Sequence, residues 1–152
     1  MVLTPYLHLK LPIFFFINTV YLNSFFDIRK IRQMQVVWFK RDLRTLDHEA
    51  LYRASYAGDV LPIYIFEPEL WIQRDLSHRH YKFLCDCLAE LDIELKKLGQ
   101  NLIIETGDAT DILGQIHSNH QIHTLWSHQE TWNNWTYKRD QKVKKWTSKN
   151  SI

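Results

Sequence analysis

Residues 36–51 read VVWFKRDLRTLDHEAL, and this stretch decides the fold. An apolar run from Val36 to Phe39 turns abruptly into a charged loop, and helix signals begin at Asp47. Parallel strands covered on both faces read as unbroken apolar runs, and open α/β sheets bind ligands beyond the carboxyl ends of their strands. We therefore expect a buried parallel strand that ends at a ligand-binding rim.

Strand and helix signals alternate along the rest of the chain. Apolar runs predict further strands at 60–66, 102–105 and 124–127. Four helices are expected between and after these strands, at 47–57, from Ser77 to Gly99, from Gly107 onward and at 136–149. In the first helix, Asp47 is the predicted N-cap and Gly58 the residue that ends it. In the third, Ile112, Leu113 and Ile116 should point inward. This alternation predicts an α/β fold, a Rossmann-like doubly wound parallel sheet. The pattern ends at Ile152, so we expect it to be truncated before a fifth strand.

The helix from Ser77 to Gly99 carries the clearest periodic signal. Its large apolar residues recur at spacings of three and four: Tyr81, Leu84, Leu88, Leu91, Leu95 and Leu98. Such a stripe is typical of a helix face that packs on the core. We expect all six side chains to face the sheet.

Residues 1–33 differ in character from the segment 34–152. The apolar stretch from Leu11 to Phe26 is interrupted by polar residues and is shorter than the roughly 20 residues that span a bilayer. No small-residue cleavage site of a signal peptide follows it. We expect residues 1–33 to be a non-native or disordered extension, with translation starting at Met34 and the domain occupying 34–152. We expect no membrane anchor.

Charge, cysteine and histidine content indicate little by themselves. The chain has 152 residues and a formal net charge of +2, too small to imply nucleic-acid binding. The basic run from Lys138 to Lys149 is most simply a solvated helix face. Cys85 and Cys87 lie two positions apart on a helix and cannot pair, which is typical of reduced thiols in a cytoplasmic protein. The histidines at 117, 120 and 123 do not share one face, so we expect no metal site.

The candidate binding residues lie on two loops at the same rim. The loop after the first strand lacks the glycines of a dinucleotide motif or a P-loop. In it, Asp42 stands between Arg41 and Arg44, either as a local ion-pair network or as a way to present an arginine to a partner domain or an anionic ligand. The loop from His128, with Glu130, either binds a flat ring or packs against a neighbouring domain. We expect no catalytic residue.

Five segments resemble, in order, the N-terminal domain of the DNA photolyase/cryptochrome family. The opening stretch is similar to the family's aromatic-basic-x-Asp-Leu-Arg-x-x-Asp signature. The other four are LPIYIFEP at 61–68, SHRH at 77–80, LWSHQET at 125–131 and YKRD at 137–140. The resemblance covers residues 34–152. It implies an α/β domain that holds an antenna chromophore, a folate or a deazaflavin in many members, in DNA-repair enzymes or blue-light photoreceptors.

The resemblance also implies what this chain lacks. In the family, FAD and the DNA-binding face belong to a larger helical domain, and no segment here resembles it. His48 stands where the family commonly has asparagine, and the Asn-Glu pair of folate-binding members is missing near Trp135, which argues against folate. We expect an N-terminal fragment that is inactive alone and reaches DNA only through a helical domain. The alternatives are a stand-alone pigment- or nucleotide-binding module and one half of a split photolyase.

Overall fold

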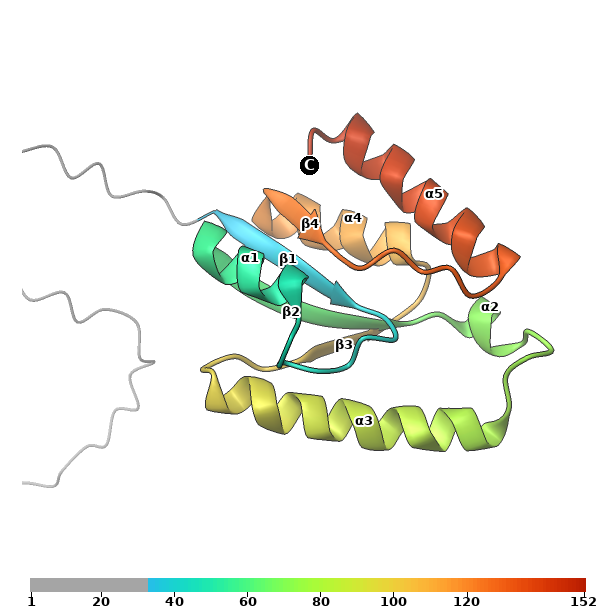
Figure 1. Ribbon diagram of the computed structural model, residues 1–152. Coiled ribbons are helices and arrows are strands. Elements are labelled where there is room, and N and C mark those ends of the chain that lie inside the picture. Colours follow the sequence, from blue (N-terminus) through green and yellow to red (C-terminus); the bar gives the residue numbers. More distant parts are fainter. Residues whose placement is uncertain (1–32) are drawn as a thin grey trace, which may run out of the picture. The chain divides into compact units, whose positions relative to one another are not determined.

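The computed structural model describes residues 33–152, and the expectations for residues 1–32 lie outside this range. A parallel sheet of four strands forms the centre, in the order β3-β2-β1-β4 (Figure 1). The strands are β1 (Met34–Phe39), β2 (Asp59–Phe66), β3 (Ile103–Thr106) and β4 (Thr124–Trp126). The predicted α/β fold with a Rossmann-like parallel sheet is therefore confirmed.

Helices cover both faces of the sheet. They are α1 (Glu49–Ala57), α2 (Pro68–Trp71), α3 (His78–Lys97), α4 (Ala109–His120) and α5 (Asn134–Lys149). Alternate residues of β1 face opposite sides, as the pleat of a strand requires. Trp38 packs with residues of α4 and α5, whereas Phe39 packs with residues of α1 and α3. The sheet is thus wound in both directions from β1.

Helix α1 begins two residues later than predicted. His48 is the N-cap, and its Nδ1 accepts the Leu51 N–H at 3.0 Å. Asp47, the predicted cap, instead has a φ of 51° and turns the chain in the left-handed region. At the other end, the predicted stop is confirmed, because the Gly58 N–H bonds the Ala54 carbonyl. Only glycine fits here, since a Cβ would lie 2.0 Å from the Gln33 carbonyl oxygen.

The apolar stripe of α3 faces the sheet only in part. Leu88, Leu91 and Leu95 are buried, but Tyr81 is 40% exposed and Leu98 is 66% exposed. A helix of 20 residues is about 30 Å long, whereas β3, the strand that follows it, has only four residues. The first half of α3 therefore extends beyond the sheet (Figure 1), which the spacing of leucines alone does not reveal.

Helices α4 and α5 start at side-chain caps. The Asp108 carboxylate accepts the N–H groups of Thr110 and Asp111, and Asn133 accepts that of Thr136. Helix α5 thus begins at Asn134, two residues earlier than expected. None of the helices within residues 33–152 has the length and apolar character needed to cross a bilayer.

Candidate functional site

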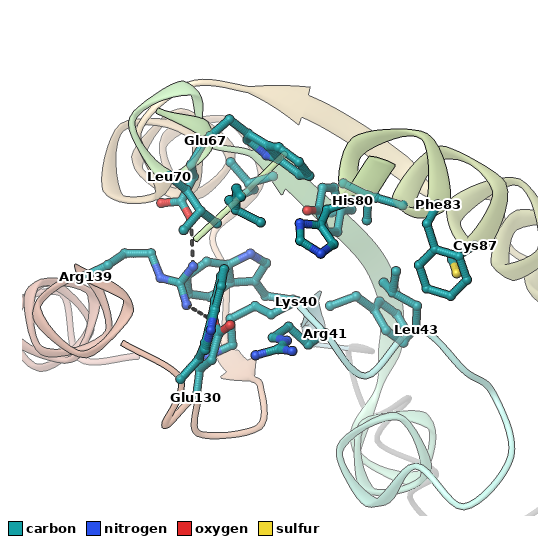
Figure 2. A pocket seen from close by; sticks show the side chains of 18 of the residues that line it. Lys40, Arg41, Leu43, Glu67, Leu70, His80, Phe83, Cys87, Glu130 and Arg139 are labelled. Carbon is teal, nitrogen blue, oxygen red and sulfur yellow. Dashed lines mark hydrogen bonds and ion pairs between the residues drawn. The ribbon is translucent and has the colours of Figure 1, made fainter. Parts of the chain in front are cut away.

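A cavity of about 590 Å³ lies at the carboxyl ends of the strands. Strand order reverses at β1, which has β2 on one side and β4 on the other, and ligands of open α/β sheets bind at such a switch point. One wall is apolar and comes from the loop after β1 and from α3, with Leu43, Phe83 and Cys87 (Figure 2). The opposite wall is charged and carries Glu67, Glu130 and Arg139 (Figure 2).

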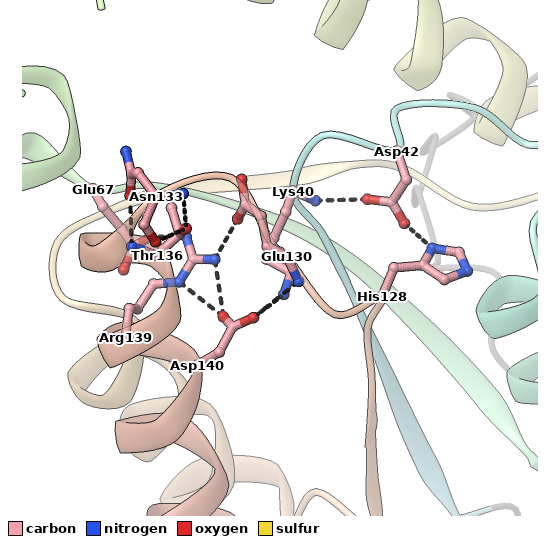
Figure 3. Close-up of polar contacts among 9 residues, drawn as sticks. All are labelled: Lys40, Asp42, Glu67, His128, Glu130, Asn133, Thr136, Arg139 and Asp140. Carbon is pink, nitrogen blue, oxygen red and sulfur yellow. Dashed lines mark hydrogen bonds and ion pairs between the residues drawn. The ribbon is translucent and has the colours of Figure 1, made fainter. Parts of the chain in front are cut away.

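Arg139 is the centre of a buried ion cluster beside this cavity. Its guanidinium lies 2.8 Å from Glu67, 2.5 Å from Glu130 and 2.9 Å from Asp140. The Lys40 ammonium joins the cluster at 3.0 Å from Asp140 (Figure 3). The end of β2, the loop after β4, α5 and the end of β1 are thereby tied together around one arginine.

The cluster holds three carboxylates but only two cations. Burial raises the pKa of Glu67 to about 7, and the attraction of Arg139, which it shares with Glu130 and Asp140, offsets burial only in part. For Arg139, burial opposes the charge, but the surrounding carboxylates outweigh it and raise its pKa. The arginine therefore stays charged, while Glu67 is the group that takes up a proton near neutral pH.

Asp42 lies between two histidines rather than between two arginines. Its carboxylate contacts His128 Nδ1 and accepts the Lys40 N–H at 3.0 Å (Figure 3). It also lies 2.8 Å from His48 Nε2. The His48 contact is electrostatic, because the carboxylate lies off the direction of a hydrogen bond. Burial opposes ionisation of Asp42, but the two histidines and the Lys40 N–H outweigh it and hold its pKa well below the usual range.

These three side chains approach one another closely enough to suggest a metal site. The candidate ligand atoms of Asp42, His48 and His128 all lie within 4.8 Å of one another. However, His48 Nδ1 accepts the Leu51 N–H, so the neutral ring carries its proton on Nε2. A protonated nitrogen cannot ligate a metal, so the hydrogen bonding of His48 argues against a metal ion bound by these three residues.

Arg41 and Arg44 are both free of carboxylates. Arg41 stacks over the Trp132 ring, 4.7 Å from its centroid, and Arg44 donates to the Asp47 carbonyl at 3.2 and 3.3 Å. Neither has an ion-pair partner among residues 33–152. Of the two interpretations of this loop, the local ion-pair network of Arg41, Asp42 and Arg44 is therefore wrong, because the Asp42 carboxylate contacts His48 and His128 instead. Two arginines remain on the cavity lining with no anion to neutralise them.

All five predicted residues lie at this rim, in two adjoining hollows. Arg41, Arg44 and Glu130 line the large cavity, and they share a second hollow of about 300 Å³ with Asp42 and His128. That these residues bind a cofactor stays a prediction.

Sequence reasoning missed several residues of the lining. They are Glu67, Trp71 and Arg139. The one available signal was the Arg139-Asp140 pair on a helix that otherwise carries only basic charges. Within residues 33–152, the indole Nε1 of Trp71 is buried without a hydrogen-bond partner.

Comparison with known proteins places the chain beside one group. The model of the family described as DNA photolyase matches residues 35–152. The chain is 38% identical over 108 residues to a "Cryptochrome DASH, chloroplastic/mitochondrial" of Oryza sativa subsp. japonica, covering 63% of this chain and 18% of that protein. It is 31% identical over 121 residues to the deoxyribodipyrimidine photo-lyase of Buchnera aphidicola, covering 74% and 24%.

A solved structure agrees with the fold. The archaeal photolyase from Sulfolobus tokodaii, described with two FAD molecules and a novel light-harvesting cofactor, superposes with a TM-score of 0.70 at 27% identity. The match covers 79% of this chain and 28% of that one. The chain spans about a fifth of the length of the curated relatives it matches.

Proposed function

Because the chain belongs to the DNA photolyase family, we propose that its α/β domain binds a planar, light-absorbing chromophore and acts as the antenna part of a photolyase or cryptochrome. The observation that carries this proposal is the 590 Å³ cavity at the switch point of the sheet, whose lining includes several aromatic rings and two arginines with no ion-pair partner among residues 33–152. Pockets that bind small molecules and cofactors typically have volumes of about 300–1,000 Å³, so this cavity is large enough for such a ligand.

The lining favours a ring with polar edges and an anionic tail. The buried Nε1–H of Trp71 needs an acceptor, and a ring carbonyl would supply one. Arg41 and Arg44 suit a phosphate or carboxylate, since a guanidinium binds either in a bidentate manner. A flavin or deazaflavin that carries a phosphate has both features. We place folate second, because the Asn-Glu pair of folate-binding members is missing.

The wider activity of the family is also part of the proposal. Light-driven DNA repair or blue-light signalling would need the FAD-binding helical domain, with which this domain would work, whether on the same chain or a separate one. Apart from that domain we expect no repair activity. The two thiols, Cys85 and Cys87, are unpaired, in keeping with the proposed cytoplasmic location.

Titration of the purified full chain with FMN, 8-hydroxy-5-deazariboflavin and 5,10-methenyltetrahydrofolate tests the proposal. We expect saturable quenching of ligand fluorescence for a flavin-type ring and weaker binding of the folate. Arg41→Ala should weaken FMN binding by at least about tenfold, as expected for the loss of a hydrogen bond to a charged group. Arg53→Ala is the matched control, because Arg53 is 61% exposed on α1, where it pairs with Glu49, and does not line the cavity.

Two results would contradict the proposal. In the first, none of the three ligands binds. In the second, Arg41→Ala and Arg53→Ala weaken FMN binding equally, so that binding reflects overall charge and not the cavity. Preferential binding of the folate would overturn the assignment of the ring while leaving the antenna role in place.

A further inference from the structure

Helix α5 presents a row of lysines to solvent. Lys138, Lys142, Lys145 and Lys149 are all exposed, and their spacings of four, three and four place them on one face of the helix. Another exposed lysine, Lys144, lies beside this row. The row spans twelve residues, and its first and last lysines are about 16 Å apart at the rise of an α-helix.

Carboxylates neutralise little of this row. The helix has one acidic residue, Asp140, which is already bound to Lys40 and Arg139. Lys142 pairs with Asp108 at 2.8 Å. The other lysines of the row have no carboxylate partner within residues 33–152. At least three uncompensated cations therefore stand in line.

In place of the expectations that this face is merely solvated and that the chain reaches DNA only through a helical domain, we propose that this row, Lys138, Lys142, Lys145 and Lys149, is a binding surface for the phosphate backbone of a nucleic acid, without sequence preference. A narrow line of cations fits a strand, which presents a phosphate about every 3.4 Å of duplex axis. An anionic membrane would need large apolar side chains on the same face to enter the lipid. Tyr137 is the one large exposed aromatic of α5, so the observations favour nucleic acid.

The number of free lysines sets the expected salt dependence. Three neutralised phosphates give a slope of about −2.7 in log K against log salt for duplex DNA, or roughly a 40-fold loss of affinity between 50 and 200 mM salt. Lys142 should add little, because Asp108 already lies against it. The surface lies on α5, apart from the chromophore cavity, and the inference does not depend on the proposed antenna role.

Fluorescence anisotropy of the full chain with a labelled 20-base-pair duplex of random sequence tests this surface. The triple variant K138Q/K145Q/K149Q should bind at least about tenfold more weakly at 50 mM salt and lose most of the salt slope. The matched control is R79Q/K82Q/K97Q, which removes three exposed cations from α3 that have no carboxylate partner within residues 33–152 and changes the net charge equally. Its affinity should stay within about twofold of the parent chain.

A charge-preserving variant separates electrostatics from folding. K138R/K145R/K149R should keep the affinity of the parent chain, because arginine also binds phosphate. The proposal is overturned if the parent chain shows no saturable binding at 50 mM salt, or if both glutamine variants lose affinity equally. It is also overturned if the chain binds vesicles of 30% phosphatidylserine in phosphatidylcholine but not the duplex.

Discussion

Replacing Glu67 by glutamine should remove a pH dependence that Glu67 imposes on folding. The side chain is buried, and its pKa rises from 4.5 to about 7 in the folded state. A group whose pKa is raised by folding stabilises the protein below its unfolded pKa, and this stabilisation is lost as pH rises through the folded value. Glu67 alone should therefore lower the free energy of unfolding by about 2.5 kcal/mol between pH 5 and pH 8.

Glutamine keeps the shape of Glu67 but cannot ionise, so this contribution disappears in Glu67→Gln. Urea unfolding followed by tryptophan fluorescence at pH 5, 6, 7 and 8 measures the free energy of unfolding of both proteins. We expect the advantage of the parent chain over the variant to shrink by about 2.5 kcal/mol over this range. Asp42 and Asp108, whose pKa values are lowered, titrate in both proteins and cancel in the difference.

Glu69→Gln is the matched control, because Glu69 is exposed on α2 two residues away. It should show no comparable change with pH relative to the parent chain. A difference between the parent chain and Glu67→Gln that stays constant from pH 5 to pH 8 would refute the reasoning. It would mean that Arg139 keeps all three carboxylates ionised over this pH range and that Glu67 takes up no proton.

Three further substitutions test other parts of the fold, each by urea unfolding. Gly58→Ala should cost about 1–3 kcal/mol, because the new methyl group overlaps the Gln33 carbonyl, and an unchanged midpoint would contradict the fit at this turn. His48→Ala should lower the free energy of unfolding by about 1–2 kcal/mol, because helix α1 loses its N-cap, whereas His48→Asn should keep most of this stability. Equal losses in the two variants would show that capping is not the cause. Arg139→Met should lower the free energy of unfolding by about 3–5 kcal/mol at pH 8, because it leaves the Glu67 carboxylate buried without its cation, and by less at pH 5, where Glu67 is protonated. A loss that does not depend on pH would show that the charge of Glu67 is not the cause.

The elements of the fold were predictable because their signals are local. Apolar runs such as Val36–Phe39 and caps such as Ser77 and Asp108 depend on neighbours in sequence. Failures occurred where tertiary context decides. The spacing predicts a wholly buried stripe on α3, but the helix is longer than β3, and Tyr81, which packs edge-on against the rings of Phe66 and Trp71, stays 40% exposed. At the start of α1, Asp47 and His48 are both possible N-caps. The left-handed backbone at Asp47 turns the chain there, so His48 is the N-cap.

The candidate site was predictable in place but not in its pairing. Parallel topology brings the loops after β1 and β4 to one rim, so Arg41 and His128 could be placed there from the order of the elements. Which groups pair is a matter of distances across the chain. Asp42 binds His128, which lies 86 residues away, and Arg139 binds Glu67, 72 residues away. Residue spacing along the sequence cannot predict contacts between side chains so far apart in the chain.

The overhang of α3 has a consequence for how a ligand would enter. Phe83 is 70% exposed, yet it lines the cavity together with its partly buried neighbours Leu84 and Cys87. None of the residues 78–87 is buried, whereas Leu88, Leu91 and Leu95 in the second half of α3 are, and helical segments with less burial open locally at lower free energy. Amide hydrogen exchange should be much faster over residues 78–87 than over 88–97. The entry rate of a chromophore would then be governed by local fraying of one helix and not by the width of the cavity mouth.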